Sequence, residues 1–302
     1  MQTVGVIGLG IMGSAMAANL IRAGYRVVGY DVRSSRVRAH ERAGGTAARS
    51  AGDVARQATG VILSLPSAAA LVETAAALAR HPGAARVVIE TSTLPIAAKE
   101  RARRTLEVAG ITLLDCPLSG TGSQARERDI VVYASGPKAA YRRVGSVLDA
   151  VARARYHVGP FGAGSKTKFV ANLLVAIHNV AAAEALVLAM KAGLHPATTL
   201  KVIADGAGSS RMLQVRGPMM VRGDYSKPTM KLDVWQKDMR IIGAFAREVG
   251  APTPLFRASA PIYAAALADG RGGEDTGAVC AVLEKVAKYR RRGRTSRKRQ
   301  LT

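Results

Sequence analysis

Two hydrophobic patterns divide the chain. Through residue 136, short apolar runs rich in Val and Ile alternate with segments of helical character. Such runs are typical of buried strands, which we expect within 3–7, 26–30, 60–67, 86–95, 110–120 and 129–136. Strands that alternate with helices predict an α/β Rossmann-type fold with a doubly wound parallel sheet. Its ligands should bind beyond the carboxyl ends of the strands.

From Gly164 the strand pattern stops. The segment "SKTKFVANLLVAIHNVAAAEALVLAMKAGL" is apolar nearly all round, which predicts one long, buried helix. Further helices are expected near 196–204, 209–221, 231–249, 254–269 and 275–289. We therefore expect a Rossmann domain over 1–162, an all-α domain for substrate binding and oligomerisation over 163–289, and a basic, disordered tail over 290–302.

A glycine motif follows the first predicted strand. Gly8, Gly10 and Gly13 have G-x-G-x-x-G spacing, a helical segment follows, and Asp31 closes the next strand. In this context the glycines permit a tight turn, approach of the backbone to a pyrophosphate, and close helix–strand packing. Asp31 would bind ribose hydroxyls and repel a 2′-phosphate. NAD is the expected cofactor, and Arg33 keeps NADP as the alternative.

Polar residues gather where later strands end. Leu65 and Pro66 follow one run, Ser92 and Thr93 another, and Ser119, Gly120 and Thr121 a third. These positions suit ligand contacts at the carboxyl edge of a sheet. Ser and Thr are equally typical of helix N-caps. Local sequence leaves both interpretations open.

The long helix carries two lysines near its start. Lys168 and Asn172 lie about 40° apart around a helix, whereas Lys166 lies about 200° from Lys168. With Ser165 and Asn179, Lys168 and Asn172 form a polar stripe that predicts a cavity lining, and Lys166 should face solvent. Farther on, Lys237 and Asp238 taken alone favour a surface pair, as most such charges are.

The composition of the chain bears on which binding partners and metal sites are expected. The net charge is +23, and the acid-free segment 288–302 holds eight Lys and Arg. A like-charge run of this kind is typical of a disordered end, so nucleic-acid binding is not favoured. Two cysteines and five scattered histidines form no disulfide framework or metal site. We expect no signal peptide, no membrane span and a cytoplasmic protein.

Four segments in order give the chain a family resemblance. "GLGIMGSAMAANL", "LDCPLSGTGSQA", "GAGSKTKFVANLL" and "QKDM" resemble the cofactor, substrate, catalytic and Lys-Asp motifs of the β-hydroxyacid dehydrogenase family. The resemblance implies Lys168 as the catalytic residue with Asn172 beside the substrate, and a homodimer or homotetramer. The implied substrate contacts are Ser119, Gly120, Thr121, Lys168, Asn172 and Lys237. The implied cofactor contacts are Gly8, Leu9, Gly10, Ile11, Met12, Gly13, Asp31, Leu65, Pro66, Thr93 and Lys237.

The expected reaction is hydride transfer between a nicotinamide cofactor and a small 3-hydroxy acid or its semialdehyde. Lys168 would act as general acid and base. The chain departs from the family at Thr121, commonly Gly, and at Glu90, often Asp, which leaves the substrate open. Two alternatives remain: an imine reductase-like enzyme, which Lys168 disfavours, and a non-catalytic nucleic-acid-binding or scaffold protein that uses the basic tail.

Overall fold

The structure is a computed structural model that describes residues 2–81 and 83–291. The chain forms two compact units, Met1–Ala171 and Asn172–Thr302, which divide within the long helix. The predicted domain boundary at 162/163 stays a prediction. Most of the predicted tail lies outside the described residues. Arg291, at its start, pairs with Glu284.

The first unit contains a six-stranded parallel sheet in the order β3-β2-β1-β4-β5-β6. The strand order reverses between β1 and β4, which is where doubly wound sheets bind dinucleotides. Its strands are β1 (Thr3–Ile7), β2 (Arg26–Tyr30), β3 (Thr46–Ala47), β4 (Gly60–Leu63), β5 (Val87–Glu90) and β6 (Thr112–Asp115). Its helices are α1 (Ile11–Arg22), α2 (Ser34–Arg42), α3 (Ala51–Gln57), α4 (Ala68–Arg80) and α5 (Ile96–Val108).

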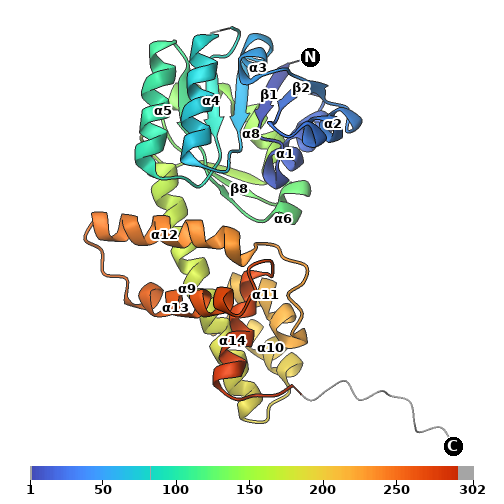
Figure 1. The fold of residues 1–302 in the computed structure, drawn as a ribbon, viewed down its shortest axis with the longest axis vertical. Coiled ribbons are helices and arrows are strands. Elements are labelled where there is room, and N and C mark those ends of the chain that lie inside the picture. Colours follow the sequence, from blue (N-terminus) through green and yellow to red (C-terminus); the bar gives the residue numbers. More distant parts are fainter. Residues whose placement is uncertain (1, 82, 292–302) are drawn as a thin grey trace, which may run out of the picture. The chain divides into compact units, whose positions relative to one another are not determined.

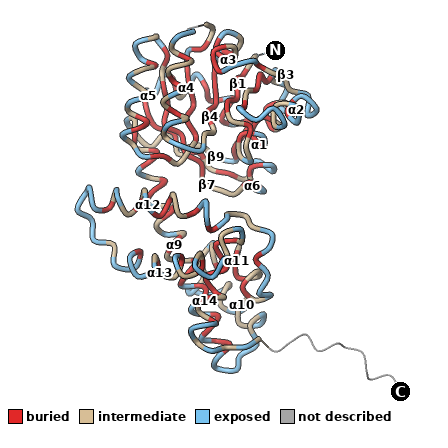
Figure 2. The backbone as a smooth tube through the Cα atoms, in the orientation of Figure 1, coloured by how far each residue is buried: buried red, intermediate tan, exposed pale blue. Residues whose placement is uncertain are grey.

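Both faces of this sheet are buried, which explains its continuous apolar strands. Alternate residues of one strand enter different cores: Ile62 of β4 packs on the α1 side, whereas Val61 and Leu63 pack beneath α3, α4 and α5. Figure 1 shows these three helices along one face, and Figure 2 shows the strands as largely buried. The predicted Rossmann fold is confirmed.

The later strands do not join this sheet. β7 (Leu118–Ser119), β8 (Val131–Ala134) and β9 (Ala154–His157) form a separate three-stranded sheet in which β7 and β8 are antiparallel. The predicted strand over 110–120 is therefore two strands. Pro117 separates them because it has no N–H to continue a ladder. Helices α6 (Gly122–Arg126), α7 (Lys138–Arg143) and α8 (Gly145–Val151) complete this part.

Helices make up the rest of the described chain. They are α9 (Ala163–Lys191), α10 (Pro196–Ala204), α11 (Arg211–Arg222), α12 (Leu232–Glu248), α13 (Pro254–Ala268), a 3₁₀ turn (Thr276–Ala278) and α14 (Val279–Val286). Each predicted helical segment is present. The last, predicted at 275–289, is shorter and begins with the 3₁₀ turn.

By length and composition alone α9 could cross a membrane, although no membrane span is expected from the sequence. Half of its most apolar window is buried within the protein. Asn179 is fully buried and donates to the Tyr263 hydroxyl, which in turn donates to the Ala176 carbonyl. These buried polar contacts are those of a core helix packed against protein.

Candidate functional site

The glycine turn after β1 has two kinds of glycine. A Cβ on Gly8 would lie 2.2 Å from the Ser64 carbonyl oxygen, and one on Gly13 would lie 1.8 Å from the Gly8 carbonyl oxygen. Protein packing therefore requires both. A Cβ on Gly10 would meet only Arg36, at 3.9 Å. Packing does not require a glycine there, so the open approach to its backbone suits a ligand at the uncapped start of α1.

Asp31 is buried at the end of β2 and is held by three donors. Its Oδ2 accepts from the Leu9 amide at 2.8 Å and from Arg36 Nη1 at 3.1 Å, and its Oδ1 accepts from the Arg33 amide at 2.9 Å. Asp31 thus ties the glycine turn to the end of β2. Sequence reasoning considered Arg33 and missed Arg36, whose guanidinium is the one paired with the carboxylate.

The loops after β4 and β5 are joined by Ser92. Its hydroxyl accepts from the Leu65 amide at 2.8 Å, and its own amide donates to Glu90 Oε1 at 2.9 Å. Leu65 and Thr93 are half-buried and Pro66 is exposed. The two predicted nicotinamide-side segments are therefore neighbours. Ser92, for which the sequence left a ligand contact and a helix cap open, bonds to the Leu65 amide and to Glu90.

The predicted substrate segment lies beside the glycine turn. Gly120 has φ 141°, and a Cβ there would lie 2.6 Å from Ile130, so a side chain at this position would be strained. A Cβ on Gly122 would lie 2.2 Å from Ile11 Cγ2, which shows that Ile11 packs over the start of α6. The first unit thus brings the Gly8–Gly13 turn and the Ser119–Thr121 segment together.

Thr121 is the N-cap of α6. Its hydroxyl lies within hydrogen-bonding distance of Ser123 Oγ and Gln124 Oε1 and accepts from the Gln124 amide, and Gln124 bonds back to the Thr121 amide in a capping box. The helix-cap interpretation holds for this residue. Its hydroxyl serves the cap.

The two lysines of α9 differ as the helical spacing predicts. Lys166 is exposed, whereas Lys168 is buried at 8% exposure. Asn172, one turn beyond Lys168, is also buried. The ends of the polar stripe have structural partners: Ser165 donates to Asp115, and Asn179 donates to Tyr263. Ser165 and Asn179 thus bond to protein groups, and the cavity lining stays a prediction.

Within the second unit, Asn172 is fixed by α12. Its Nδ2 donates to Asp238 Oδ2 at 2.9 Å, and Lys237 Nζ lies 3.7 Å from Asp238 Oδ1. Asp238 is 6% exposed. The surface-pair interpretation is thus wrong for Asp238, which is buried because it is the partner of Asn172. Lys237 is one-third exposed.

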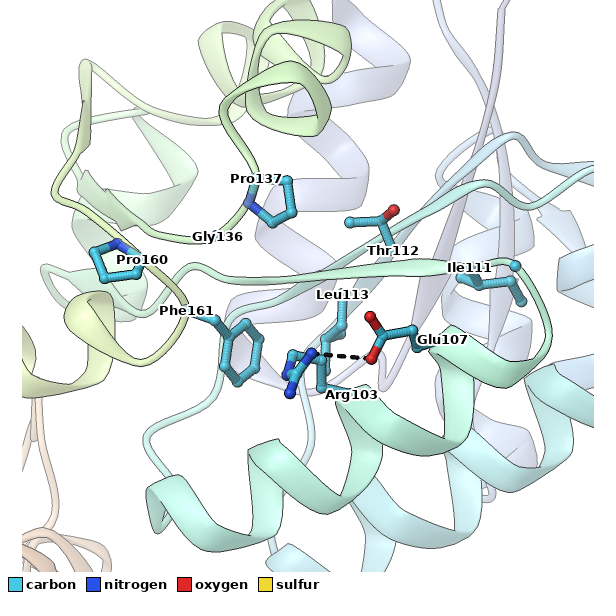
Figure 3. Close-up of a pocket in the computed structure, with 10 residues that line it drawn as sticks. Arg103, Glu107, Ile111, Thr112, Leu113, Gly136, Pro137, Pro160 and Phe161 are labelled. Carbon is cyan, nitrogen blue, oxygen red and sulfur yellow. Dashed lines mark hydrogen bonds and ion pairs between the residues drawn. The ribbon is translucent and has the colours of Figure 1, made fainter.

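Two of the pockets formed by the described residues lie in the first unit. One of about 580 Å³ lies between α5, β6 and the Pro160–Phe161 segment; Arg103 lies over the Phe161 ring and pairs with Glu107 (Figure 3). Its lining contains no predicted site residue. The other, of about 160 Å³, is lined by Leu9, Arg36 and His40 and so adjoins the Asp31 end of the predicted cofactor site. Among the described residues no cluster of three His, Cys, Asp or Glu could hold a metal.

The strand order, the glycine turn and the buried acid define a dinucleotide-binding protein of the Rossmann class. Residues 3–159 match the NAD binding domain of 6-phosphogluconate dehydrogenase, and residues 162–283 match the NAD-binding domain of NADP-dependent 3-hydroxyisobutyrate dehydrogenase. The second match covers the helical part, so the similarity extends beyond a shared Rossmann domain.

Similar proteins cover nearly the whole chain. An L-threonate dehydrogenase of Cupriavidus necator is 35% identical over 93% of this chain and 96% of its own length. A 3-hydroxyisobutyrate dehydrogenase of Pseudomonas aeruginosa is 34% identical over 84% and 89%. The solved 3-hydroxyisobutyrate dehydrogenase of Mycobacterium tuberculosis with L-serine superposes with a TM-score of 0.85 at 29% identity, over 94% of this chain and 99% of its own.

The chain belongs to the β-hydroxyacid dehydrogenase family. It is an NAD(P)-dependent oxidoreductase acting on small hydroxy acids. The residues present fit the cofactor: the backbone at Gly10 is open to a ligand, and Asp31 is held at the end of β2. The imine reductase and non-catalytic alternatives are not favoured.

Proposed function

We propose that Lys168 is the general acid and base of this dehydrogenase. The observation that carries the proposal is the contrast on α9, where Lys168 is buried beside buried Asn172 while Lys166, two residues earlier, is exposed. Lys168 also lies within the segment that resembles the family's catalytic motif.

The proposed division of labour is short. When bound, the nicotinamide ring accepts or gives the hydride. Lys168 takes the hydroxyl proton at Nζ during oxidation and returns it during reduction. Its ammonium form also stabilises negative charge on the substrate oxygen. Asn172, fixed by Asp238, orients the lysine or the substrate hydroxyl. Lys237 is proposed to contact both the cofactor and the substrate.

Substrate capture is proposed for the Ser119–Gly120 segment. Gly120 holds a positive-φ conformation that other residues rarely adopt, and Ser119 offers a hydroxyl and an amide. Thr121 contributes through the position it gives to this segment, because its hydroxyl caps α6. The first substrate to test is L-threonate, on which relatives such as the Cupriavidus necator enzyme act. The other substrates to compare are 3-hydroxyisobutyrate and related small hydroxy acids.

We make further proposals for the cofactor, the oligomeric state and the cellular location. NAD is preferred to NADP because the Asp31 carboxylate at the end of β2 opposes a 2′-phosphate. Leu65, Pro66 and Thr93 would line the nicotinamide side. We also propose a homodimer or homotetramer in the cytoplasm. Nucleic acid and membranes are not proposed partners.

A substrate screen tests the function. Purified protein is mixed with NAD and, in turn, L-threonate, 3-hydroxyisobutyrate, other small hydroxy acids and their methyl esters, and reduction is followed by absorbance. We expect one or more acids to be oxidised and the matching ester to react poorly. Absence of activity on every acid, with both NAD and NADP, would contradict the proposed function. Equal rates for acid and ester would remove the carboxylate contact from it.

A further inference from the structure

Three charged side chains meet in the interior of the first unit. Lys99 Nζ lies 2.5 Å from Glu90 Oε2 and 2.7 Å from Asp115 Oδ1, and all three side chains have no exposed surface. Two acidic side chains share one ammonium, so the Lys99 cluster (Lys99, Glu90 and Asp115) has one acid more than it has bases. Glu90 ends β5, Asp115 ends β6, and Lys99 lies in the first turns of α5.

One arm of the Lys99 cluster reaches the start of α9. Asp115 Oδ2 accepts from the Ser165 amide at 2.7 Å, and Oδ1 accepts from the Ser165 hydroxyl at 2.8 Å. The Gly164 amide donates to Ser135 Oγ at 2.9 Å, and that hydroxyl donates to the Asp115 carbonyl. A carboxylate at a helix N-terminus is stabilised by the free amides and the helix dipole. Ser165 lies one turn before Lys168.

The other arm reaches the loop after β5. Glu90 Oε1 accepts from the Ser92 amide, and Ser92 holds the Leu65 amide. The proposed nicotinamide-side residues Leu65 and Thr93 lie in these two loops. Lys99 is therefore the shared partner of a group that fixes α9 and a group that shapes the loops after β4 and β5.

Stability alone is a weak reason to keep such a cluster. Burying ions is expensive, and apolar residues of similar volume often serve as well or better. Two carboxylates against one lysine is a less favourable arrangement still. The cluster instead fixes a position, because its hydrogen bonds define where the first turn of α9 begins.

We propose that Lys99 is a positioning residue that, through Asp115 and Ser165, sets the start of α9 and thereby the place of Lys168. This inference rests on the proposed role of Lys168. Lys99 touches no reacting atom and acts only through its carboxylate partners. The Glu90 arm is secondary, because it ends on backbone amides of loops rather than on the helix that bears Lys168.

The test uses a charge-matched double variant. Lys99→Met alone would leave two buried carboxylates unpaired and could prevent folding. Lys99→Met with Glu90→Gln keeps one negative charge, on Asp115, and the new side-chain amide oxygen can still accept from the Ser92 amide. Glu90→Gln alone is the control, because it keeps the Lys99–Asp115 pair. Ser165→Ala, with Ser165→Thr as the rescue, removes a single hydrogen bond and serves should the double variant not fold.

Two measurements are made on the full chain. Hydrogen exchange of the 163–171 peptide, without ligands, is expected to be about 10- to 100-fold faster in the double variant, the scale of a lost charge-assisted bond. With the best substrate from the screen, kcat is expected to fall about 10- to 100-fold, as for a sub-ångström misplacement of a catalytic group. NADH affinity by fluorescence should stay near the wild-type value. Ser165→Ala should move both readouts the same way, and Ser165→Thr should restore them.

The outcomes separate this inference from the proposed function. A folded double variant with wild-type exchange at 163–171 and wild-type kcat overturns the positioning role, and so does a Ser165→Ala variant unchanged in both. Equal losses in Glu90→Gln and in the double variant overturn the assignment to the Asp115 arm. If the wild type oxidises no hydroxy acid, the proposed function fails, and the exchange rates still decide whether Lys99 sets the start of α9.

Discussion

Each unit of the protein contains a fully buried acid paired with a buried base, and the surroundings of the two pairs differ. In the second unit, Asp275 is fully buried and faces buried Arg216 at 2.9 Å. Its other partners are the Thr229 amide and hydroxyl and the amides of Met230 and Gly277. One acid meets one base, and donors surround the carboxylate. The Lys99 cluster of the first unit has one base for two acids.

The difference indicates different purposes. The Asp275 carboxylate joins the end of the loop before α12 to the 3₁₀ turn and to α11, with its charge balanced and its oxygens satisfied, so it holds the fold together. The Lys99 cluster has one acid more than it has bases, and its Asp115 carboxylate accepts from the Ser165 amide of α9. A balanced cluster should therefore matter for stability, whereas changes around α9 should matter for turnover.

The largest effect is expected at Lys168. Replacing Lys168 by Ala should lower kcat about 10²- to 10⁴-fold, the scale for removing a positioned acid or base. NADH binding should persist, because the Gly8–Gly13 turn does not depend on this side chain. Steady-state kinetics with NADH fluorescence titration checks both points.

Lys166→Ala is the matched control for Lys168. Its side chain is exposed two residues away on the same helix, so kcat should stay near the wild-type value. An inactive Lys166→Ala protein, or an active Lys168→Ala protein, would show that the assignment of the chemistry to the Lys168 face of α9 is wrong.

The next largest effect is expected at Asp275, where a substitution should lower the stability of the fold and leave kcat unchanged. Burial alone would raise the pKa of this carboxyl, but Arg216 and the donors at Gly277 and Thr229 outweigh it and hold the pKa below its ordinary value. The carboxylate therefore stabilises the fold above its unfolded pKa, and this contribution is lost as pH falls through the folded pKa. Asp275→Asn should cost about 3–5 kcal/mol near neutral pH, because Arg216 loses its partner.

Urea unfolding against pH checks this prediction, with Asp269→Asn as the control. Asp269 pairs with Lys285, whose side chain is 71% exposed, so its loss should cost less than about 1 kcal/mol. At temperatures where the Asp275→Asn protein is folded, its kcat should match the wild type. A large fall in kcat without a loss of stability would reverse the contrast between the two clusters.

Sequence reasoning succeeded where the signal is local. The Gly8–Gly13 turn with its flanking strand and helix, the helices after Gly164 and the exposure difference between Lys166 and Lys168 all follow from spacing along one element. It failed where partners are distant. Asp238 meets Asn172 across 66 positions and Asp115 meets Ser165 across 50, and neither pairing has a trace in local periodicity. Strands β3 and β9 were missed because two to four half-buried residues give no clear alternation.

A smaller effect is expected where a charge pair is half-exposed, at Asp31 and Arg36. Arg36 is 39% exposed, so the pair should contribute little stability and act instead on the choice of cofactor. Asp31→Ser should remove the repulsion of a 2′-phosphate and release Arg36 to bind it. The kcat/KM ratio of NAD to NADP is expected to fall about tenfold or more, the scale of a lost charge contact. A wild-type preference for NADP would contradict the assignment of Asp31.

The smallest effect is expected at His40, a buried residue outside both charge clusters, and concerns the pH dependence of stability. Burial lowers the pKa of His40 below its ordinary value of 6.5, and a hydrogen bond with the Val27 carbonyl opposes the shift only in part. As pH falls below about 6.5, the unfolded chain takes up a proton before the folded protein does, so stability should decline until His40 itself protonates. The expected loss in Tm is a few degrees, about 2–4 °C. His40→Gln should flatten this acid slope between pH 7 and 5 by differential scanning fluorimetry, whatever its effect on absolute stability. An unchanged slope in the variant would assign the pH dependence to other groups and leave the neutral, buried state of His40 without a stability consequence.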